Sequence, residues 1–272
     1  MPVYLLIDNG SKKPEATLRL REVAKKLSGI TSKTVHPVSL QHADSIAANK
    51  LENNPAKIFY SFLSEQLAKG EKEFVVLPLF FGMSRALSSF IPGQVSLLEK
   101  EYGAFKLKLA DVIFPLPAGE TRLAKILHDH INIVAANENF VTKKVVLVDH
   151  GSPSPKITEV RKQVAIQLRT IFDDNVVIDE AVMERRPGSE YDFNGDLLED
   201  YLKEQAKNGS NDIIVAMLFF LPGRHAGDCG DIQEICDKVT RDFTGLNIAI
   251  TPLISEHELL LSILHDRLLA AE

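Results

Sequence analysis

The sequence predicts an α/β protein of two tandem, similar domains, each with a mostly parallel, doubly wound four-stranded sheet that has helices on both faces. Three observations lead to this prediction. The chain repeats itself once, short apolar segments alternate with amphipathic ones, and a polar stretch at residues 135–144 separates the two copies. Strand signals that alternate with helix signals are typical of parallel sheets with right-handed crossovers. The 272 residues, 45% of them hydrophobic, are enough for two cores of ordinary size.

The internal repeat is visible at three places. IDNGS at residues 7–11 recurs as VDHGS at 148–152, LPLFFG at 77–82 as AMLFFLPG at 216–223, and ILHD at 126–129 as ILHD at 263–266. The offset between the copies stays between 137 and 141 residues along the chain. A nearly constant offset indicates duplication of a whole domain. We therefore expect one domain at residues 1–137 and a second at 138–272.

Each copy is expected to contain four strands, each followed by a helix. In the second copy the expected strands are short and almost continuously apolar: Val145–Val148, Val176–Met183, Ile213–Leu221 and Asn247–Leu253. Such strands are typical of parallel sheets that are covered on both faces. After the first strand, apolar residues recur at helical spacing, at Ile157, Val160, Val164, Leu168 and Ile171.

The composition narrows the class of protein. A net charge of −6 argues against a nucleic-acid partner, which needs a basic face, but not against an anionic small ligand. The longest apolar run, Ile213–Leu221, is too short to span a bilayer, and the first residues lack the features of a secretory signal. Two cysteines give no disulfide framework. We expect a cytoplasmic protein without a membrane partner.

Polar side chains follow three strands of the second copy. In doubly wound sheets, ligands bind beyond the carboxyl ends of the strands, so the loops at these ends are the candidate site. The chemically capable residues in the three loops are His150, Ser152, Glu184, Arg185, Arg186, Arg224 and His225.

The first copy has lost the titratable members of this set together. It has Asn9 at the position of His150, Gln41 at that of Glu184 and Ala86 at that of His225. Replacing a carboxylate or an imidazole by an amide keeps much of the shape while removing basicity and most metal affinity. We therefore interpret the second copy as the active one.

Two imidazoles and a carboxylate suit divalent first-row metals such as cobalt, nickel, iron or zinc. Three ligands are too few to close a structural cage, so positions stay open for a substrate. The arginines suit an acidic partner, because guanidinium groups bind carboxylates bidentately. This combination predicts metal transfer to a polyacid, or metal-assisted hydrolysis of one.

At these residues the sequence resembles the class II tetrapyrrole chelatases, specifically the sirohydrochlorin chelatase family. The matching segments are LVDHGSP, the apolar residue and carboxylate Met183-Glu184, and FFLPGRHAGDCGDI. Together with the duplication, the resemblance extends over the whole chain. It implies a chelatase of the lyase class that inserts a divalent metal, cobalt or ferrous iron, into a macrocycle with eight carboxylates, for cobalamin or siroheme.

The resemblance also implies roles for individual residues. His150 and His225 are expected to bind the incoming metal, with Glu184 as a third ligand and assisting acid or base. Ser152 and the arginines Arg185, Arg186 and Arg224 are expected to bind the macrocycle. No cofactor is expected beyond the substrate metal ion, Co²⁺ or Fe²⁺, with Ni²⁺ as an alternative. The first copy is expected to complete the cleft, which favours a monomer over a homodimer.

Several alternatives stay open. His150 could only cap its turn, Glu184 could pair with a neighbouring arginine on a solvated loop, and Cys229 could add a soft ligand near His225. Cys236 shares an apolar helical face and is expected in the core. Phosphate-binding glycine motifs and a nucleophile elbow are missing from the sequence. A non-catalytic carrier of a metal or a metallotetrapyrrole is the main competing function, because it needs the same side chains.

Overall fold

The structure is a computed structural model that describes residues 2–272. The chain forms two compact units, and each contains one four-stranded sheet. The first unit consists of residues up to Ala118 together with Leu261–Glu272, and the second of Gly119–Leu260. Both sheets are parallel throughout. The prediction of two tandem α/β domains with parallel sheets is confirmed.

The first unit alternates strands and helices. Its strands are β1 (Val3–Asp8), β2 (Val35–Ser39), β3 (Glu73–Pro78) and β4 (Lys106–Leu109), in the spatial order β2-β1-β3-β4. Its helices are α1 (Pro14–Thr31), α2 (Phe59–Ala68), α3 (Ile91–Tyr102) and most of α8 (Leu259–Ala270). Short helical turns are η1 (Ala43–Ser45), η2 (Ala48–Leu51) and the π-helical η3 (Ala86–Phe90).

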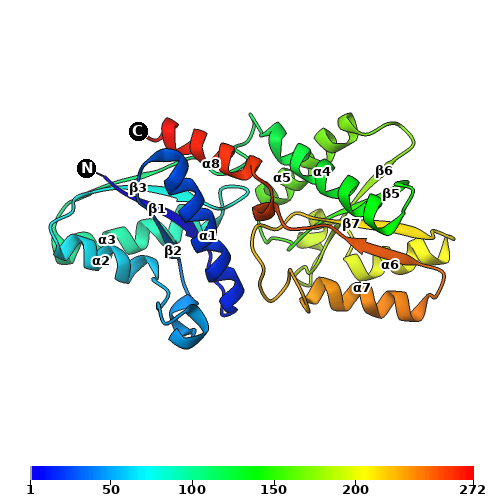
Figure 1. Cartoon of the computed structure of the whole chain (residues 1–272), viewed down its shortest axis with the longest axis horizontal. Helices are drawn as coiled ribbons and strands as arrows, with labels where there is room; N and C mark the ends of the chain where they lie inside the picture. The colour runs from blue at the N-terminus through cyan, green and yellow to red at the C-terminus, as the bar shows by residue number, and fades with distance from the viewer. Residues whose placement is uncertain (1) are drawn as a thin grey trace. The chain divides into compact units, whose positions relative to one another are not determined.

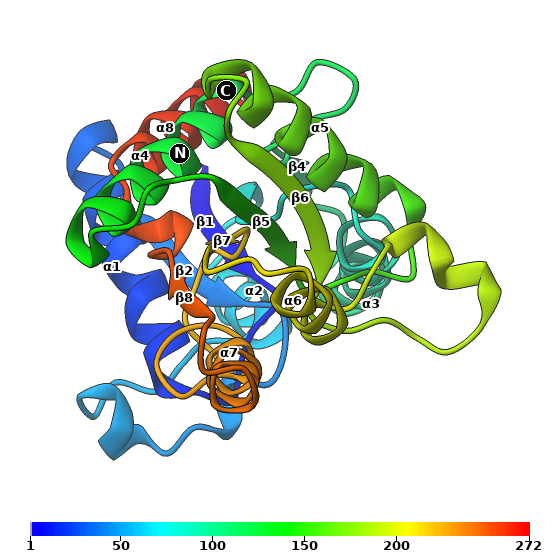
Figure 2. The same ribbon diagram turned by 90° about the vertical axis from the view of Figure 1, so that its right-hand side faces the viewer.

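The second unit repeats this plan. Its strands are β5 (Lys144–Asp149), β6 (Val177–Val182), β7 (Asp212–Met217) and β8 (Asn247–Ile250), in the order β6-β5-β7-β8. Its helices are α4 (Thr121–Glu138), α5 (Pro155–Ile171), α6 (Leu198–Lys207) and α7 (Asp231–Asp242), with 3₁₀ turns η4 (Ser189–Asn194) and η5 (Ile254–Glu256). Figure 2 shows β5 and β6 side by side, with α5 beside β6.

The second sheet is covered on both faces, as its apolar strands predict. All four residues of Val145–Val148 are completely buried. The helices α6 and α7 pack on one face, where Leu202, Val215 and Cys236 belong to one hydrophobic cluster. The helices α4 and α5 lie on the other side of the sheet (Figure 1). Burial on two faces explains why the strands carry no polar alternation.

The last helix of each sequence copy packs in the unit of the other copy. Helix α4 ends the first copy, but it belongs to the second unit and packs beside α5 and against β7 and β8. Helix α8 ends the second copy, but Arg267 donates to the carbonyl oxygens of Val112 and Ile113 at 3.0 and 3.1 Å, within the first unit. The compact units therefore differ from a division at residues 137/138. Hydrophobic periodicity shows that a helix has an apolar face but not which sheet it covers.

The strand bounds differ modestly from those expected. Strand β7 ends at Met217 instead of continuing to Leu221, because the carbonyl groups of Phe219 and Phe220 accept hydrogen bonds from the η5 segment and no longer pair with β5. Strand β8 ends at Ile250, two residues before Pro252, which has no N–H to donate to a sheet.

Within residues 2–272 no helix is both long and apolar enough to cross a membrane.

Candidate active site at the carboxyl edge of the second sheet

The order β6-β5-β7-β8 places the topological switch point between β5 and β7. The chain leaves β5 toward β6 on one side and returns to β7 on the other. Loops that leave the carboxyl ends of these two strands diverge and open a crevice for ligands. His150 directly follows β5, and His225 lies in the loop after β7. The topology thus brings the two histidines to one edge of the sheet.

The two imidazole rings lie against each other. Their centroids are 4.6 Å apart and their planes are inclined at 75°. On the other side, Nε2 of His150 is 3.4 Å from Oε1 of Glu184, which follows β6. The His150 and Glu184 side chains are 46% and 60% exposed, so an incoming ligand can reach them.

Asp231 orients the second imidazole. Its Oδ2 lies 2.6 Å from Nδ1 of His225. When Nδ1–H donates to this carboxylate, Nε2 is left with a lone pair for a metal or a proton. The same carboxylate oxygen is 3.6 Å from Nε of Arg224. Sequence reasoning missed Asp231, although it stands at the start of a helix in the segment that carries the resemblance.

A glycine turn holds His150 near Glu184. Gly151 has φ +89°, and a Cβ atom there would lie 1.9 Å from the carbonyl oxygen of Glu184. The amide of Glu184 in turn donates to the carbonyl oxygen of His150 at 3.2 Å. Only glycine allows this conformation and this approach without strain. The backbone of the two loops is therefore in direct contact at this turn.

The same turn exists in the first unit without the chemistry. Gly10 has φ +92°, and a Cβ atom there would lie 1.8 Å from the carbonyl oxygen of Gln41. This equivalence supports matching Gln41 with Glu184 and Asn9 with His150. Ala86 lies in the π-helical turn that leads into α3, whereas His225 lies in an irregular loop before α7. The first unit thus keeps the turn and lacks all three titratable side chains.

The predicted arginines differ in how far their donors are occupied. Nη1 of Arg185 donates to the carbonyl oxygen of Gly195 at 3.0 Å and lies 3.3 Å from Asp192, within its own loop. The guanidinium of Arg186 lies over the ring of Tyr191, 5.9 Å from its centroid. The side chain of Arg224 is 77% exposed. Of the three, Arg224 and Arg186 are therefore better placed than Arg185 to bind an anionic ligand.

A buried polar group lies beneath the His150 turn. Nη1 of Arg161, on α5, is 2.7 Å from Oδ1 of Asp149, and both side chains are buried. Burial raises the pKa of Asp149 above its ordinary value, and the guanidinium of Arg161 acts against this rise. The Oγ of Ser152 accepts from the amide of Ser154 at 3.1 Å, within its own turn. Arg161 was not predicted, although it is a charged residue within the apolar stripe of its helix.

The candidate metal ligands of the site contact one another only in pairs. Throughout residues 2–272, no three His, Cys, Asp or Glu side chains are gathered so that they could hold a metal ion. The set expected from the sequence is present as two contacts, His150 with His225 and His150 with Glu184, rather than as a preformed three-ligand group. Cys229 is exposed, and Cys236 is buried in the core as expected, with a pKa that burial raises to about 12.

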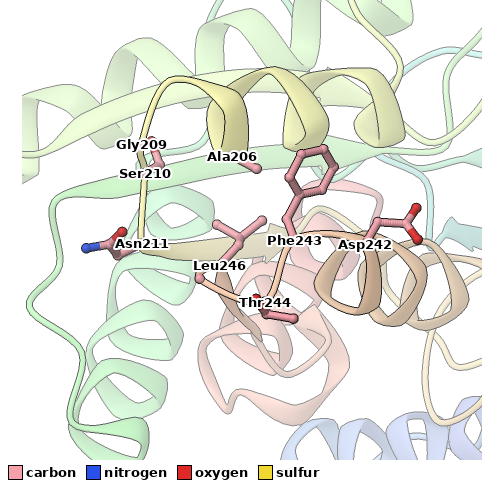
Figure 3. A pocket seen from close by; sticks show the side chains of 9 residues that line it. Ala206, Gly209, Ser210, Asn211, Asp242, Phe243, Thr244 and Leu246 are labelled. Atoms are coloured by element: carbon pink, nitrogen blue, oxygen red, sulfur yellow. The ribbon is translucent and has the colours of Figure 1, made fainter.

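A separate surface pocket lies at the opposite edge of the second sheet. It is formed by the ends of α6 and α7 and the residues just before β7 and β8, with Asn211, Asp242 and Phe243 among its lining residues (Figure 3). None of its lining residues is a histidine, lysine or arginine. Because it lies at the amino ends of the strands, it is distinct from the histidine site.

Comparison with known proteins gives one family and several structures. Residues 144–271 match the CbiX family model. No curated protein sequence matches the chain. Two structures of SirB match over 100% of this chain. The structure from Bacillus subtilis with Fe³⁺ has 14% sequence identity and a TM-score of 0.68, and 96% of its length is covered. The structure from Bacillus subtilis subspecies spizizenii, in complex with cobalt, has 13% sequence identity and a TM-score of 0.67, and 95% of its length is covered.

A structure of CbiX, described as the terminal enzyme of siroheme biosynthesis in denitrifying bacteria, matches at 12% identity with a TM-score of 0.60 and is covered over its full length, as is this chain. These identities are low, so the structural matches concern the fold. The resemblance carried by the histidine motifs is confirmed: residues 144–271 match the CbiX family, and the chain as a whole is similar in fold to the SirB and CbiX structures, one of them described as a sirohydrochlorin chelatase.

Proposed function

We propose that the protein is a metal chelatase that inserts a divalent ion, cobalt(II) or iron(II), into sirohydrochlorin or a closely related polycarboxylate tetrapyrrole. One observation carries the proposal. The imidazoles of His150 and His225 lie 4.6 Å apart at the switch point of the domain that matches CbiX, with Glu184 beside one ring and Asp231 behind the other.

The arrangement suits transient binding of a metal ion that is a substrate. Two neutral imidazoles bind a first-row divalent ion while most of its coordination positions stay open. The incomplete ligand set is an advantage here, because the ion must leave the protein for the macrocycle. Asp231 fixes the ring of His225 and makes it a better donor, as carboxylates behind metal-binding histidines do.

Insertion also requires two protons to leave the macrocycle. Each divalent ion that enters replaces two pyrrole N–H protons, so the total charge of the ring and its centre is unchanged. Glu184 is 3.4 Å from His150 and 60% exposed, which places a carboxylate where it can accept a proton and pass it to water. His150 can accept the second proton once the metal has left it.

The carboxylates of the macrocycle need cationic partners. Arg224 extends from the loop that carries His225, and Arg186 from the loop that carries Glu184. Both are exposed, and guanidinium groups bind carboxylates with two parallel hydrogen bonds. We propose that these two arginines bind the substrate and that Arg185 orders its own loop.

The test follows the visible absorption of sirohydrochlorin without oxygen after cobalt(II) or iron(II) is added. The samples are the wild-type protein, His150→Ala, His225→Ala, and Asn9→Ala as the matched control. Insertion by the wild type is expected to exceed the protein-free rate over many turnovers. The two histidine variants are expected to lose at least 100-fold in rate, and Asn9→Ala is expected to lose nothing, because that position lacks the imidazole.

The same assay separates the competing carrier function. A carrier would bind one equivalent of metal or metallotetrapyrrole and would not accelerate insertion, so binding without turnover would contradict the chelatase proposal. Parallel measurements with cobalt(II), iron(II) and nickel(II) compare the ratios of kcat to KM. The preferred ion then connects the protein with either a cobalt- or an iron-dependent pathway.

A further inference from the structure

Arg161 is a fully buried arginine next to the candidate site. It lies on α5, its side chain is 2% exposed, and its helix neighbours Val160 and Val164 are core residues. A guanidinium group taken out of water requires several well-placed acceptors. Arg161 finds them at Asp149 Oδ1 (2.7 Å), Glu180 Oε2 (3.3 Å) and the carbonyl oxygen of Asn194 (2.5 Å).

Two of these acceptors lie where the loops of the candidate site are anchored, one at the end of β5 and one at the end of the 3₁₀ turn η4. Asp149 immediately precedes His150, and its Oδ1 also accepts from the amide of Gly151 at 3.1 Å. Asn194 ends the segment that begins at Glu184 and carries Arg186. We call the contacts of Arg161 with Asp149 and Asn194 the Arg161 bridge. It joins the loop that carries His150 to the loop that carries Glu184.

The side chain of Asn194 reinforces the bridge. It is 1% exposed; its Oδ1 accepts from the amide of Ser152, and its Nδ2 donates to the carbonyl oxygens of Ser152 and Tyr191, each at 3.0 Å. Thr158 donates to the same Oδ1 at 3.1 Å. The two loops are therefore fixed to each other and to α5 by buried hydrogen bonds, which hold geometry better than exposed ones.

The first unit is a natural comparison because it lacks the bridge. By the repeat, Leu20 takes the place of Arg161, while Asp8 and Thr17 take the places of Asp149 and Thr158. Asp8 Oδ1 and Thr17 Oγ1 are buried without hydrogen-bond partners among the described residues. Yet the glycine turn is present in both units, with Gly10 matching Gly151. The turn alone therefore does not require the arginine.

We propose that Arg161 is a positioning residue of the candidate site, which holds the His150 and Glu184 loops at the separation that metal transfer requires. The bridge is missing in the same unit that lacks the two imidazoles and the carboxylate. Arg161 is too deeply buried to touch a substrate, so it acts through Asp149 and Asn194. The role in metal transfer rests on the proposed function, but the effect of Arg161 on the positions of the two loops can be tested separately.

The main test variant is Arg161→Leu combined with Asp149→Asn. Leucine is the residue of the first unit, and the amide avoids leaving a buried carboxylate without its cation. The matched control is Arg169→Leu on the same helix. Arg169 also contacts Glu180, at 3.4 Å, but it donates to the carbonyl oxygen of Ile178 in β6 instead of to the two loops.

The double variant is expected to bind cobalt(II) at least fivefold more weakly than wild type, measured by the d–d absorption of the bound ion. Amide hydrogen exchange of Ser152 and Glu184 is expected to speed up at least tenfold, while exchange in β7 stays unchanged. Metal insertion is expected to fall at least tenfold in kcat. Arg169→Leu is expected to leave all three readouts within twofold of wild type.

The readouts separate this inference from the proposed function. If wild type binds cobalt(II) but inserts no metal, the chelatase proposal fails, and cobalt affinity and hydrogen exchange still decide on the bridge. If the folded double variant has the same cobalt(II) affinity and the same amide hydrogen exchange as the wild type, the proposed role of Arg161 is wrong. If that variant does not fold, Arg161→Lys replaces it, because a lysine can pair with Asp149 but cannot reach Asn194 at the same time. Unchanged cobalt affinity and exchange in Arg161→Lys would overturn the bridge equally.

Discussion

Asp8 and Asp149 end the first strand of their units at matching positions, but among residues 2–272 only Asp149 of the two has a cationic partner. Nη1 of Arg161 lies 2.7 Å from Asp149, whereas the matching residue near Asp8 is Leu20. Within the described chain, Oδ1 of Asp8 has no hydrogen-bond partner. Burial raises the pKa of Asp8 from 3.8 to about 6. Hydrogen bonds from Ser39 and Gly10 to the carboxyl group lower this pKa, but their effect is smaller than that of burial. The ionised carboxylate of Asp8 therefore lowers the stability of the first unit at neutral pH.

Asp8→Asn is expected to remove a pH-dependent loss of stability. Because the folded state favours the neutral carboxyl group, the unfolding free energy of the wild type falls as pH rises from about 4 through 6. Since a tenfold change in an acid constant is worth about 1.4 kcal/mol, the full loss is on the order of 3 kcal/mol above pH 7. Thermal unfolding between pH 4 and 7.5 should show the variant gaining on the wild type as pH rises.

Asp149→Asn is the matched control for this prediction. It takes an acceptor from the buried guanidinium of Arg161, so it is expected to destabilise the protein at every pH of this range. Because burial also raises the pKa of Asp149, this loss is expected to be largest at low pH. Parallel stability curves for Asp8→Asn and wild type across this pH range would contradict the role given to Asp8.

Asp231→Asn is expected to weaken the site without unfolding it. An amide still contacts His225 but no longer enforces the Nδ1–H tautomer that leaves Nε2 free for a metal. We expect a loss of roughly tenfold to 100-fold in metal affinity or in kcat, measured by cobalt titration and anaerobic insertion. Asp228→Asn, an exposed change in the loop that carries His225, is the control and should leave both unchanged. Equal effects of the two variants would show that the His225–Asp231 contact has no special role.

The fold could be predicted from the sequence largely because the chain contains two versions of it. The apolar strands of Val145–Val148 and Ile213–Leu221 predict a sheet buried on both faces, and the repeat indicates that both halves share it. The exchange of α4 and α8 could not be predicted. Helical periodicity shows that each helix has an apolar face but not which sheet that face covers.

The titratable residues of the candidate site could be predicted because the two sequence copies differ at these positions. Asn9 at the place of His150 and Ala86 at the place of His225 expose the asymmetry directly. The residues behind the histidines were missed for a physical reason. The contact of Arg161 with Asn194 joins positions 33 residues apart through a loop whose course depends on tertiary packing.

Gly151→Ala and Gly10→Ala are expected to affect stability alike and activity differently. Both positions have positive φ, and in both a Cβ atom would meet a carbonyl oxygen at less than 2 Å. The backbone conformation alone costs about 1 to 3 kcal/mol. Only Gly151→Ala moves His150 relative to Glu184, so only this variant should lose more metal insertion than its melting temperature explains. Similar specific activity of the two folded variants would contradict this prediction.

Arg224→Ala is expected to raise the KM for sirohydrochlorin about tenfold with little change in kcat, because a hydrogen bond to a charged group is worth about 1.5–3 kcal/mol. The side chain of Arg224 is 77% exposed, and under the proposed function it binds a carboxylate of the macrocycle. Arg241→Ala is the control, since it removes an exposed arginine from the last turn of α7, the helix that follows the Arg224 loop. The increase in KM should shrink with added salt, since the contact is electrostatic. An unchanged KM in Arg224→Ala, or an equal increase in Arg241→Ala, would show that overall charge rather than this side chain attracts the substrate.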